Sequence, residues 1–103
     1  MRDEPLHIMV RRERRDGRIV LVFPDDAAVG AGGLEVGVYD TAEGCHTDAS
    51  WDWVVRNTAP ATGRDAEREL AAYVRRLREL NGPVPVKTVT GKKGGLLARA
   101  AAR

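Results

Sequence analysis

The sequence predicts the class α+β: a three- or four-stranded antiparallel sheet with one long amphipathic helix packed on one face, plus a short helix in the connector after the third strand. Two strand-like runs around an Asp-Gly pair, a third apolar alternation and one long helical stripe favour this class. The 103 residues fit one domain, since two halves would each be too small for a self-sufficient core. We expect the domain at residues 1–90 and a basic, flexible tail at residues 91–103.

The first two strands are expected to form a hairpin. Residues 6–11 alternate apolar and more polar side chains, and residues 19–23 are β-branched, aliphatic or aromatic throughout. An Asp-Gly pair between the runs favours a two-residue type I′ turn. That turn would place Val10 opposite Phe23.

Residues 24–33 are rich in glycine and other small residues, so we expect a mobile loop there. A third strand is expected at residues 34–40. Twenty residues then separate this strand from the long helix, which is improbable for a structureless loop in so small a domain. We therefore expect a short helix there, capped by Asp48 or Ser50 and running through Arg56.

The long helix is expected to open at Thr62, with Asp65 three positions later as a capping-box partner. Its apolar residues recur at helical spacing, and an Asn-Gly-Pro run at 81–83 ends it. This stripe consists of Ala66, Leu70, Tyr73, Val74, Leu77 and Leu80. Residues 84–90 have strand composition, but Pro85 restricts them to an edge of the sheet.

A single helix covers only one face of a sheet, so we expect the opposite face to be exposed or to be an interface. Trp51 is expected in the core, and Trp53 lies about 200° further round a helix, toward solvent or a partner. The residues expected to contact a protein partner are Met9, Val20, Val22, Tyr39 and Trp53.

Charge is unevenly distributed along the chain. Residues 19–55 contain seven acidic residues and no Lys or Arg, whereas residues 56–103 contain eleven basic residues and four acidic ones. Such separation would steer an anionic partner, or pair two copies head to tail, unless the two parts neutralise each other within one fold.

Basic residues at the hairpin and in the tail predict contacts with phosphates, although arginines at a hairpin also promote solubility and block edge pairing. The candidate nucleic-acid-binding residues are Arg11, Arg12, Arg14, Arg15, Arg18, Lys92, Lys93, Arg99 and Arg103.

Cys45 and His46 form the densest candidate for chemistry, but adjacent side chains of an extended segment diverge and do not readily make a thiol–imidazole pair. One cysteine and two histidines also fall short of a zinc ligand set. We therefore expect no catalytic residue, metal or cofactor, with a small enzyme using these two residues as the least favoured interpretation.

We expect a cytoplasmic protein, because a single cysteine cannot form an internal disulfide and the longest apolar run is too short to span a bilayer. The expected function is that of a non-enzymatic binding or accessory protein that acts through protein–protein contacts, including contacts with itself as a homodimer. The alternative is nucleic-acid binding through the arginine-rich hairpin and the basic tail. Neither a membrane nor a small-molecule substrate is expected as a partner.

Overall fold

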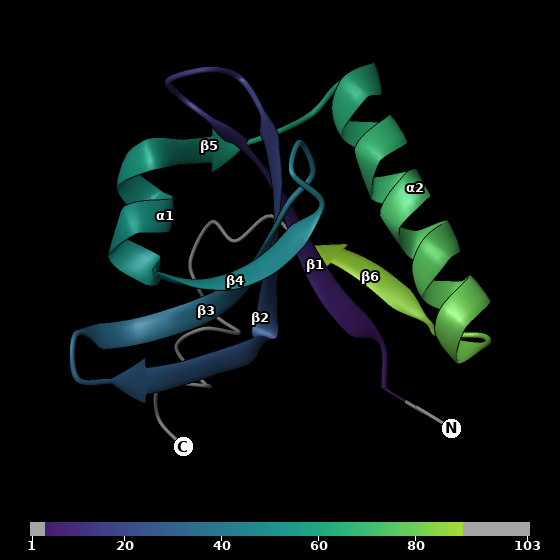
Figure 1. The fold of residues 1–103 in the computed structure, drawn as a ribbon, viewed down its shortest axis with the longest axis horizontal. Coiled ribbons are helices and arrows are strands. Elements are labelled where there is room, and N and C mark those ends of the chain that lie inside the picture. Colours follow the sequence, from purple (N-terminus) through teal and green to yellow (C-terminus); the bar gives the residue numbers. More distant parts are fainter. Residues whose placement is uncertain (1–3, 90–103) are drawn as a thin grey trace.

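The computed structural model describes residues 4–89, which form a six-stranded sheet with one helix on each face (Figure 1). The strands are β1 (Leu6–Glu13), β2 (Ile19–Gly30), β3 (Gly33–Asp40), β4 (Cys45–Ser50), β5 (Thr58–Pro60) and β6 (Val86–Val89), and the helices are α1 (Trp51–Asn57) and α2 (Arg64–Asn81). The strand order is β4–β3–β2–β1–β5. Strand β6 pairs with the first half of β1, on the same edge whose second half pairs with β5. The class α+β is confirmed, with more strands and one more covered face than expected.

The β1–β2 hairpin has the expected faces but a different register. Val10 lies opposite Leu21 instead of Phe23, because Glu13 and Arg18 close a four-residue loop where a two-residue turn was expected. A displacement of two residues leaves every side chain on its original face. The expected division of the hairpin into two faces is therefore confirmed although the turn is wrong.

Burial of β2 on both sides organises the fold. Its first six residues, 19–24, are all buried. Because successive side chains of a strand point to opposite faces, both faces of the sheet need a cover at this position. The side chains at 19, 21 and 23 pack with Ala66 of α2, whereas those at 20 and 22 pack with Val54 of α1.

Residues 24–33, expected as a mobile loop, instead complete β2 and its hairpin with β3. The strand pairing shifts between Phe23 and Ala27, so β2 contains a bulge there. Pro24 lies in the bulge, where the missing N–H interrupts no ladder hydrogen bond. A bulge conceals a strand from sequence reasoning because it breaks the alternation of apolar and polar residues.

The connector after β3 contains the expected short helix, α1. The Ser50 hydroxyl accepts a hydrogen bond from the Trp53 backbone N–H at 3.0 Å, which confirms Ser50 as the cap. Trp51 packs against the buried cluster, also as expected. The strand β4 that precedes the helix was not expected, since its sequence, CHTDAS, has no apolar alternation.

The long helix α2 begins after Gly63, with no side-chain cap, so the expected opening at Thr62 is wrong. Asp65 does not complete a capping box but accepts hydrogen bonds from both terminal nitrogens of Arg12, at 2.6 and 2.8 Å. Gly82 ends the helix with a φ of 77°, as the Asn-Gly-Pro run predicts.

Strand β6 lies at the edge of the sheet, as Pro85 predicts, but it runs parallel to β1, so the sheet is not antiparallel throughout. Its first ladder hydrogen bond comes from Leu6, whose N–H donates to the Pro85 carbonyl at 2.8 Å. The expected basic tail, residues 91–103, lies outside the described residues. Within residues 4–89, neither helix combines the length and apolar character of a membrane-spanning segment.

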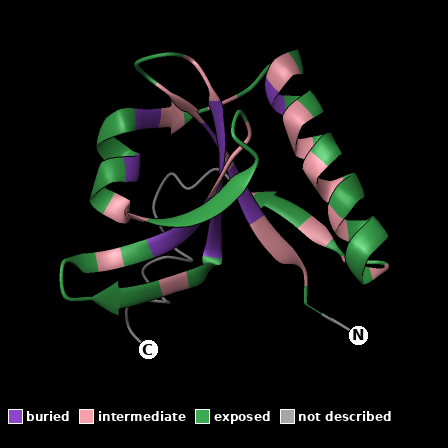
Figure 2. Ribbon diagram, in the orientation of Figure 1, coloured by how far each residue is buried: buried purple, intermediate pink, exposed green. Residues whose placement is uncertain are grey.

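The face expected to be open is covered, which corrects three of the residues expected to contact a partner (Figure 2). Met9, Val20 and Val22 are 1%, 4% and 0% exposed. They pack in one cluster with Val54 of α1, which is itself fully buried. The short helix in the connector folds back over this face, so these side chains cannot reach a partner while α1 stays in place.

A buried arginine joins β1 to α1 and β5. The Arg11 side chain is 6% exposed, and its Nε donates to the Thr58 hydroxyl at 2.6 Å while Nη2 donates to the Thr58 carbonyl at 3.0 Å. The same hydroxyl donates to the Val54 carbonyl at 2.6 Å. Burial, together with the charge of Arg14, lowers the pKa of Arg11, so the charged guanidinium depends on these acceptors.

We predict that Thr58→Val lowers the free energy of unfolding by about 2 kcal/mol, because it leaves the buried Arg11 Nε without its acceptor. The control, Thr58→Ser, keeps the hydroxyl and removes only a methyl group, at a cost of about 1 kcal/mol. Urea denaturation followed by circular dichroism measures both. Equal losses of stability for the two variants would show that the hydroxyl contributes nothing.

Candidate functional site

The surface that we name the Trp53 cleft lies between α1 and the β1–β2 loop. Val54 faces the sheet, so its neighbour Trp53 points away from the core and is 39% exposed. The cleft has a volume of about 370 Å³. It is lined by Glu13, Arg14, Arg15, Trp53, Arg56 and Asn57.

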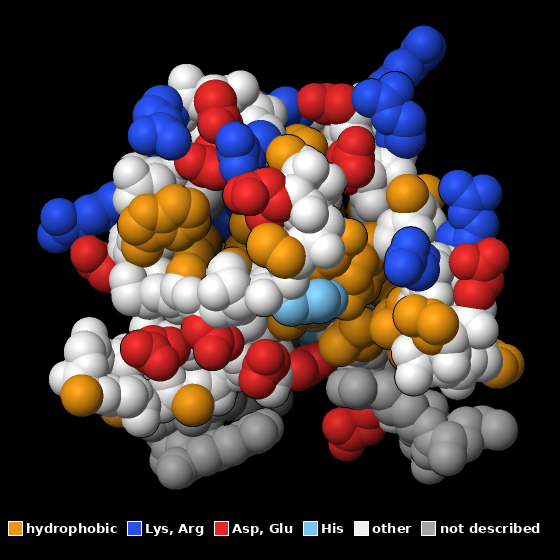
Figure 3. Space-filling view, in the orientation of Figure 1, with side chains coloured by type: hydrophobic (Ala, Val, Ile, Leu, Met, Phe, Trp, Pro, Cys, Tyr) orange, Lys and Arg blue, Asp and Glu red, His pale blue; other side chains and the backbone are white. Residues whose placement is uncertain are grey.

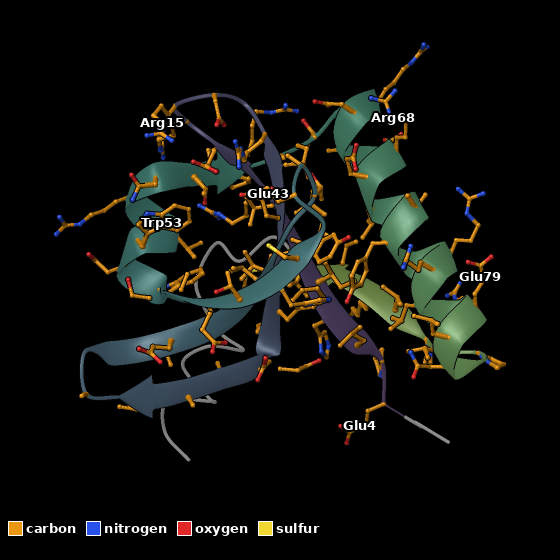
Figure 4. All side chains as sticks on the ribbon, viewed as in Figure 1. Glu4, Arg15, Glu43, Trp53, Arg68 and Glu79 are labelled. Atoms are coloured by element: carbon orange, nitrogen blue, oxygen red, sulfur yellow. The ribbon has the colours of Figure 1, made fainter. Side chains whose placement is uncertain are left out.

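Two hydrogen bonds hold the walls of the Trp53 cleft together. The Arg14 backbone N–H donates to the Asn57 carbonyl at 2.8 Å, which ties the loop to the C-terminal end of α1. The Asn57 side-chain amide then donates to the Trp53 carbonyl at 3.0 Å. Figure 4 shows Arg15 on the loop and Trp53 on α1 as neighbours at this end of the molecule. The cleft is therefore defined by backbone contacts as well as by side chains.

Three guanidinium groups give the Trp53 cleft its charge. Within residues 4–89, Arg14 and Arg15 form no ion pair. Arg56 pairs with Asp52 at 3.1 Å, but both side chains are more than 70% exposed, and such pairs contribute little. Figure 3 shows an apolar patch over α1 with basic side chains above and beside it. The Arg residues are thus available to an anion that approaches Trp53.

A second hollow, of about 410 Å³, also borders Trp53 and has a different character. Val20, Val38 and Ala49 supply apolar lining. Glu13 and Asp40 add two carboxylates, and Arg18 contacts both of them. Although burial acts to raise the pKa of Asp40, the hydrogen bond from Arg18 holds that pKa below its usual value, so the group is ionised. Trp53 therefore borders both the basic cleft and a hollow that carries carboxylates.

Three of the candidate phosphate contacts are committed to the fold. Arg11 is buried on Thr58, and Arg12 pairs with Asp65. Arg18 pairs with Asp16 at 3.0 Å and with Asp40 at 2.8 Å. Arg11 and Arg12 lie on β1, inside the sheet, so their side chains turn toward neighbouring elements instead of projecting from a free tip. Arg18 lies in the loop after β1, where carboxylates of the loop and of β3 hold it.

Of the remaining candidates, the structure exposes Arg14 and Arg15 and brings them to Trp53. The other four, Lys92, Lys93, Arg99 and Arg103, lie outside the described residues. Arg56 and Asn57 were missed as site residues. Arg56 follows Trp53 by three positions in the expected short helix, and that spacing already placed the two on one helical face.

Tyr39 is not on the face that Met9 occupies, because it pairs with Leu21 and points toward α2. Its ring lies 4.9 Å from that of Tyr73 and 4.8 Å from that of His46, centroid to centroid. Burial, with a contribution from Tyr39, raises the pKa of Tyr73, so the Tyr73 phenol stays neutral in this cluster. Tyr39 is half-buried in this aromatic cluster.

Cys45 and His46 are both exposed on β4, where adjacent side chains point to opposite faces. His46 instead approaches α2, with Nε2 at 3.3 Å from the Tyr73 hydroxyl. No three His, Cys, Asp or Glu side chains among residues 4–89 gather as a metal site. This arrangement offers neither a thiol–imidazole pair nor a ligand set.

No protein-family model, curated protein or solved structure matches this chain. The functional argument therefore rests on the geometry of the Trp53 cleft.

We predict that Trp53 fluorescence is quenched more by iodide than by caesium once each constant is divided by that for free N-acetyltryptophanamide, because the three guanidinium groups attract anions. A Trp51→Phe background isolates the Trp53 signal, and Stern–Volmer constants at matched ionic strength give the comparison. Replacing Arg14 and Arg15 by Gln should remove most of the difference. A preference for caesium would contradict a basic cleft and show that the acidic hollow dominates the field.

Proposed function

We propose that this protein is a non-enzymatic binding protein that holds single-stranded nucleic acid at the Trp53 cleft. The observation that carries the proposal is an exposed indole ring with Arg14, Arg15 and Arg56 around it. Proteins that bind single strands combine an aromatic surface, on which bases stack, with basic groups that follow the phosphates.

The phosphate contacts would come from the arginine wall. A guanidinium matches a phosphate with two parallel hydrogen bonds and keeps its charge at any physiological pH. Arg14 and Arg15 need break no ion pair with a described residue to make this contact. Arg56 would exchange an exposed carboxylate, that of Asp52, for a phosphate.

The base would stack on Trp53 and extend toward the second hollow. The N–H groups of nucleobases, including the N3–H of thymine and uracil, are hydrogen-bond donors, and carboxylates accept from such donors. The carboxylates of Glu13 and Asp40 line that hollow. A basic cleft and a hollow with two carboxylates, both bordered by the same indole ring, thus suit the two ends of a nucleotide.

A single strand fits this surface better than a duplex. The loop that carries Arg14 and Arg15 is fastened to α1 through Asn57, so it does not project as a ribbon able to enter a groove. Stacking on Trp53 also requires an unpaired base whose ring is accessible.

A protein partner is less well supported at this end of the molecule. That hypothesis depended on an open apolar face, and α1 covers Met9, Val20 and Val22. Trp53 remains a reasonable anchor for a protein contact, but its arginine neighbours favour an anionic ligand.

We predict that Trp53→Ala weakens binding of fluorescein-labelled oligo(dT) or oligo(U) by about 5- to 100-fold, the effect of removing one stacking platform. Arg14→Gln combined with Arg15→Gln should also flatten the dependence of log affinity on log salt by about 1.4, or about 0.7 for each phosphate that is no longer neutralised. Fluorescence anisotropy at several salt concentrations measures both effects.

The matched control is Arg68→Gln with Arg75→Gln, which removes two exposed arginines from α2, a helix whose residues do not line the Trp53 cleft. It should leave the slope nearly unchanged if the cleft is the site. Equal effects of the two double variants would reduce the interaction to general charge. Absence of binding to either oligonucleotide at low salt would end the proposal.

A further inference from the structure

Strand β4 is an edge that the described part of the chain leaves open. It pairs with β3 on one side, and no described strand pairs with its other side. Cys45, His46, Thr47 and Asp48 are all exposed along it. In Figure 3 the surface over β4 is mostly white, so backbone and small polar groups lie at the surface there. Edges of this kind readily pair with another strand unless Pro, Lys or a cover prevents it, and β4 has no Pro or Lys.

We infer that two copies of this protein pair through β4 in antiparallel fashion, with Thr47 of one copy opposite Thr47 of the other. The two sheets would then be continuous across a two-fold axis perpendicular to them. This inference concerns a different surface from the Trp53 cleft and does not rest on the proposed function.

The faces of β4 restrict the possible registers. His46 lies opposite Tyr39 on the α2 face, whereas Ala49 packs with the cluster under α1. A two-fold axis perpendicular to the sheet keeps each face on its own side, so a residue can only meet one of the same parity. Near the middle of the strand, this condition leaves registers centred on His46, Thr47 or Asp48.

Charge selects among these three registers. Centring on Asp48 would place two carboxylates opposite each other, and centring on His46 would place two imidazoles opposite each other, so that neither imidazole has a carboxylate partner. Centring on Thr47 places each His46 opposite an Asp48, twice across the axis, with a Thr–Thr pair between them. Only this register is complementary, so a second copy fits the edge without unfavourable pairs.

The pairing has a consequence for the surface of the assembly. Because the axis preserves faces, both α1 helices would lie on one face of the continuous sheet and both α2 helices on the other. The two Trp53 clefts would therefore flank the same face.

Charge reversal at two positions tests the register. His46→Asp alone places two carboxylates opposite each other at both 46–48 pairs, and Asp48→Lys alone replaces the carboxylate opposite His46 by an ammonium at both pairs. Each variant should therefore self-associate about tenfold more weakly than the natural chain. An equimolar mixture should form heterodimers, because every cross-strand pair is then complementary. Asp48→Lys retains the His46–Tyr73 hydrogen bond, so loss of that bond explains neither the weaker self-association of this variant nor its recovery in the mixture. Sedimentation equilibrium gives the dissociation constants.

A crosslink tests the same geometry independently of charge. Thr47→Cys in a Cys45→Ser background should oxidise to a covalent dimer with copper phenanthroline, because the two positions face each other across the axis. The natural Cys45 would lie opposite Ala49 and should crosslink poorly. Both variants change exposed side chains, and circular dichroism confirms their folding. Three results would each overturn the inference: a monomer at about 100 µM protein, a dissociation constant for the mixture no lower than those of the separate variants, or crosslinking at Cys45 instead of at Thr47→Cys.

Discussion

Burial of both faces of β2 is the constraint on which the rest of the structure depends. A strand that is apolar at successive positions cannot lie at the surface of a sheet, so it must be covered on both sides. The long helix α2 covers one side, and the connector after β3 has to supply the other. It does so with a helix of only seven residues, whose Val54 is fully buried. Because Val54 faces the sheet, the adjacent Trp53 points away from the sheet and is exposed.

The same constraint fixes where the arginines of the hairpin go. With β5 and β6 on one edge of β1 and β2 on the other, Arg11 and Arg12 point into neighbouring elements and find acceptors at Thr58 and Asp65. In the loop after β1, the side chains of Arg14 and Arg15 remain exposed. The attachment of this loop to Asn57 then places the two arginines beside the exposed indole. The candidate site thus results from the packing of the core, which accounts for a site made of residues distant in sequence.

Sequence patterns predicted the elements whose signal is local. The division of the hairpin into two faces, the Ser50 cap and the Gly82 terminus all follow from alternation or capping chemistry. Strand β4 has polar side chains at most positions, so only its pairing with β3 reveals it. The register of the hairpin depended on loop length, which an Asp-Gly pair does not determine uniquely. The face of the sheet that α1 covers depends on tertiary packing, which local sequence patterns do not reveal. That packing decides whether Met9 or Trp53 is accessible.

The central claim is that the indole of Trp53 and the guanidinium groups of Arg14 and Arg15 form one surface for a single strand. Nuclear magnetic resonance tests it most directly, by titrating a short oligo(dT) into protein labelled with ¹⁵N. We expect the largest shifts at the Trp53 indole N–H, at the Arg14 and Arg15 side-chain Nε–H groups and at the Asn57 amide, with α2 unaffected. Shifts confined to α2, or to the aromatic cluster around Tyr73, would contradict the claim.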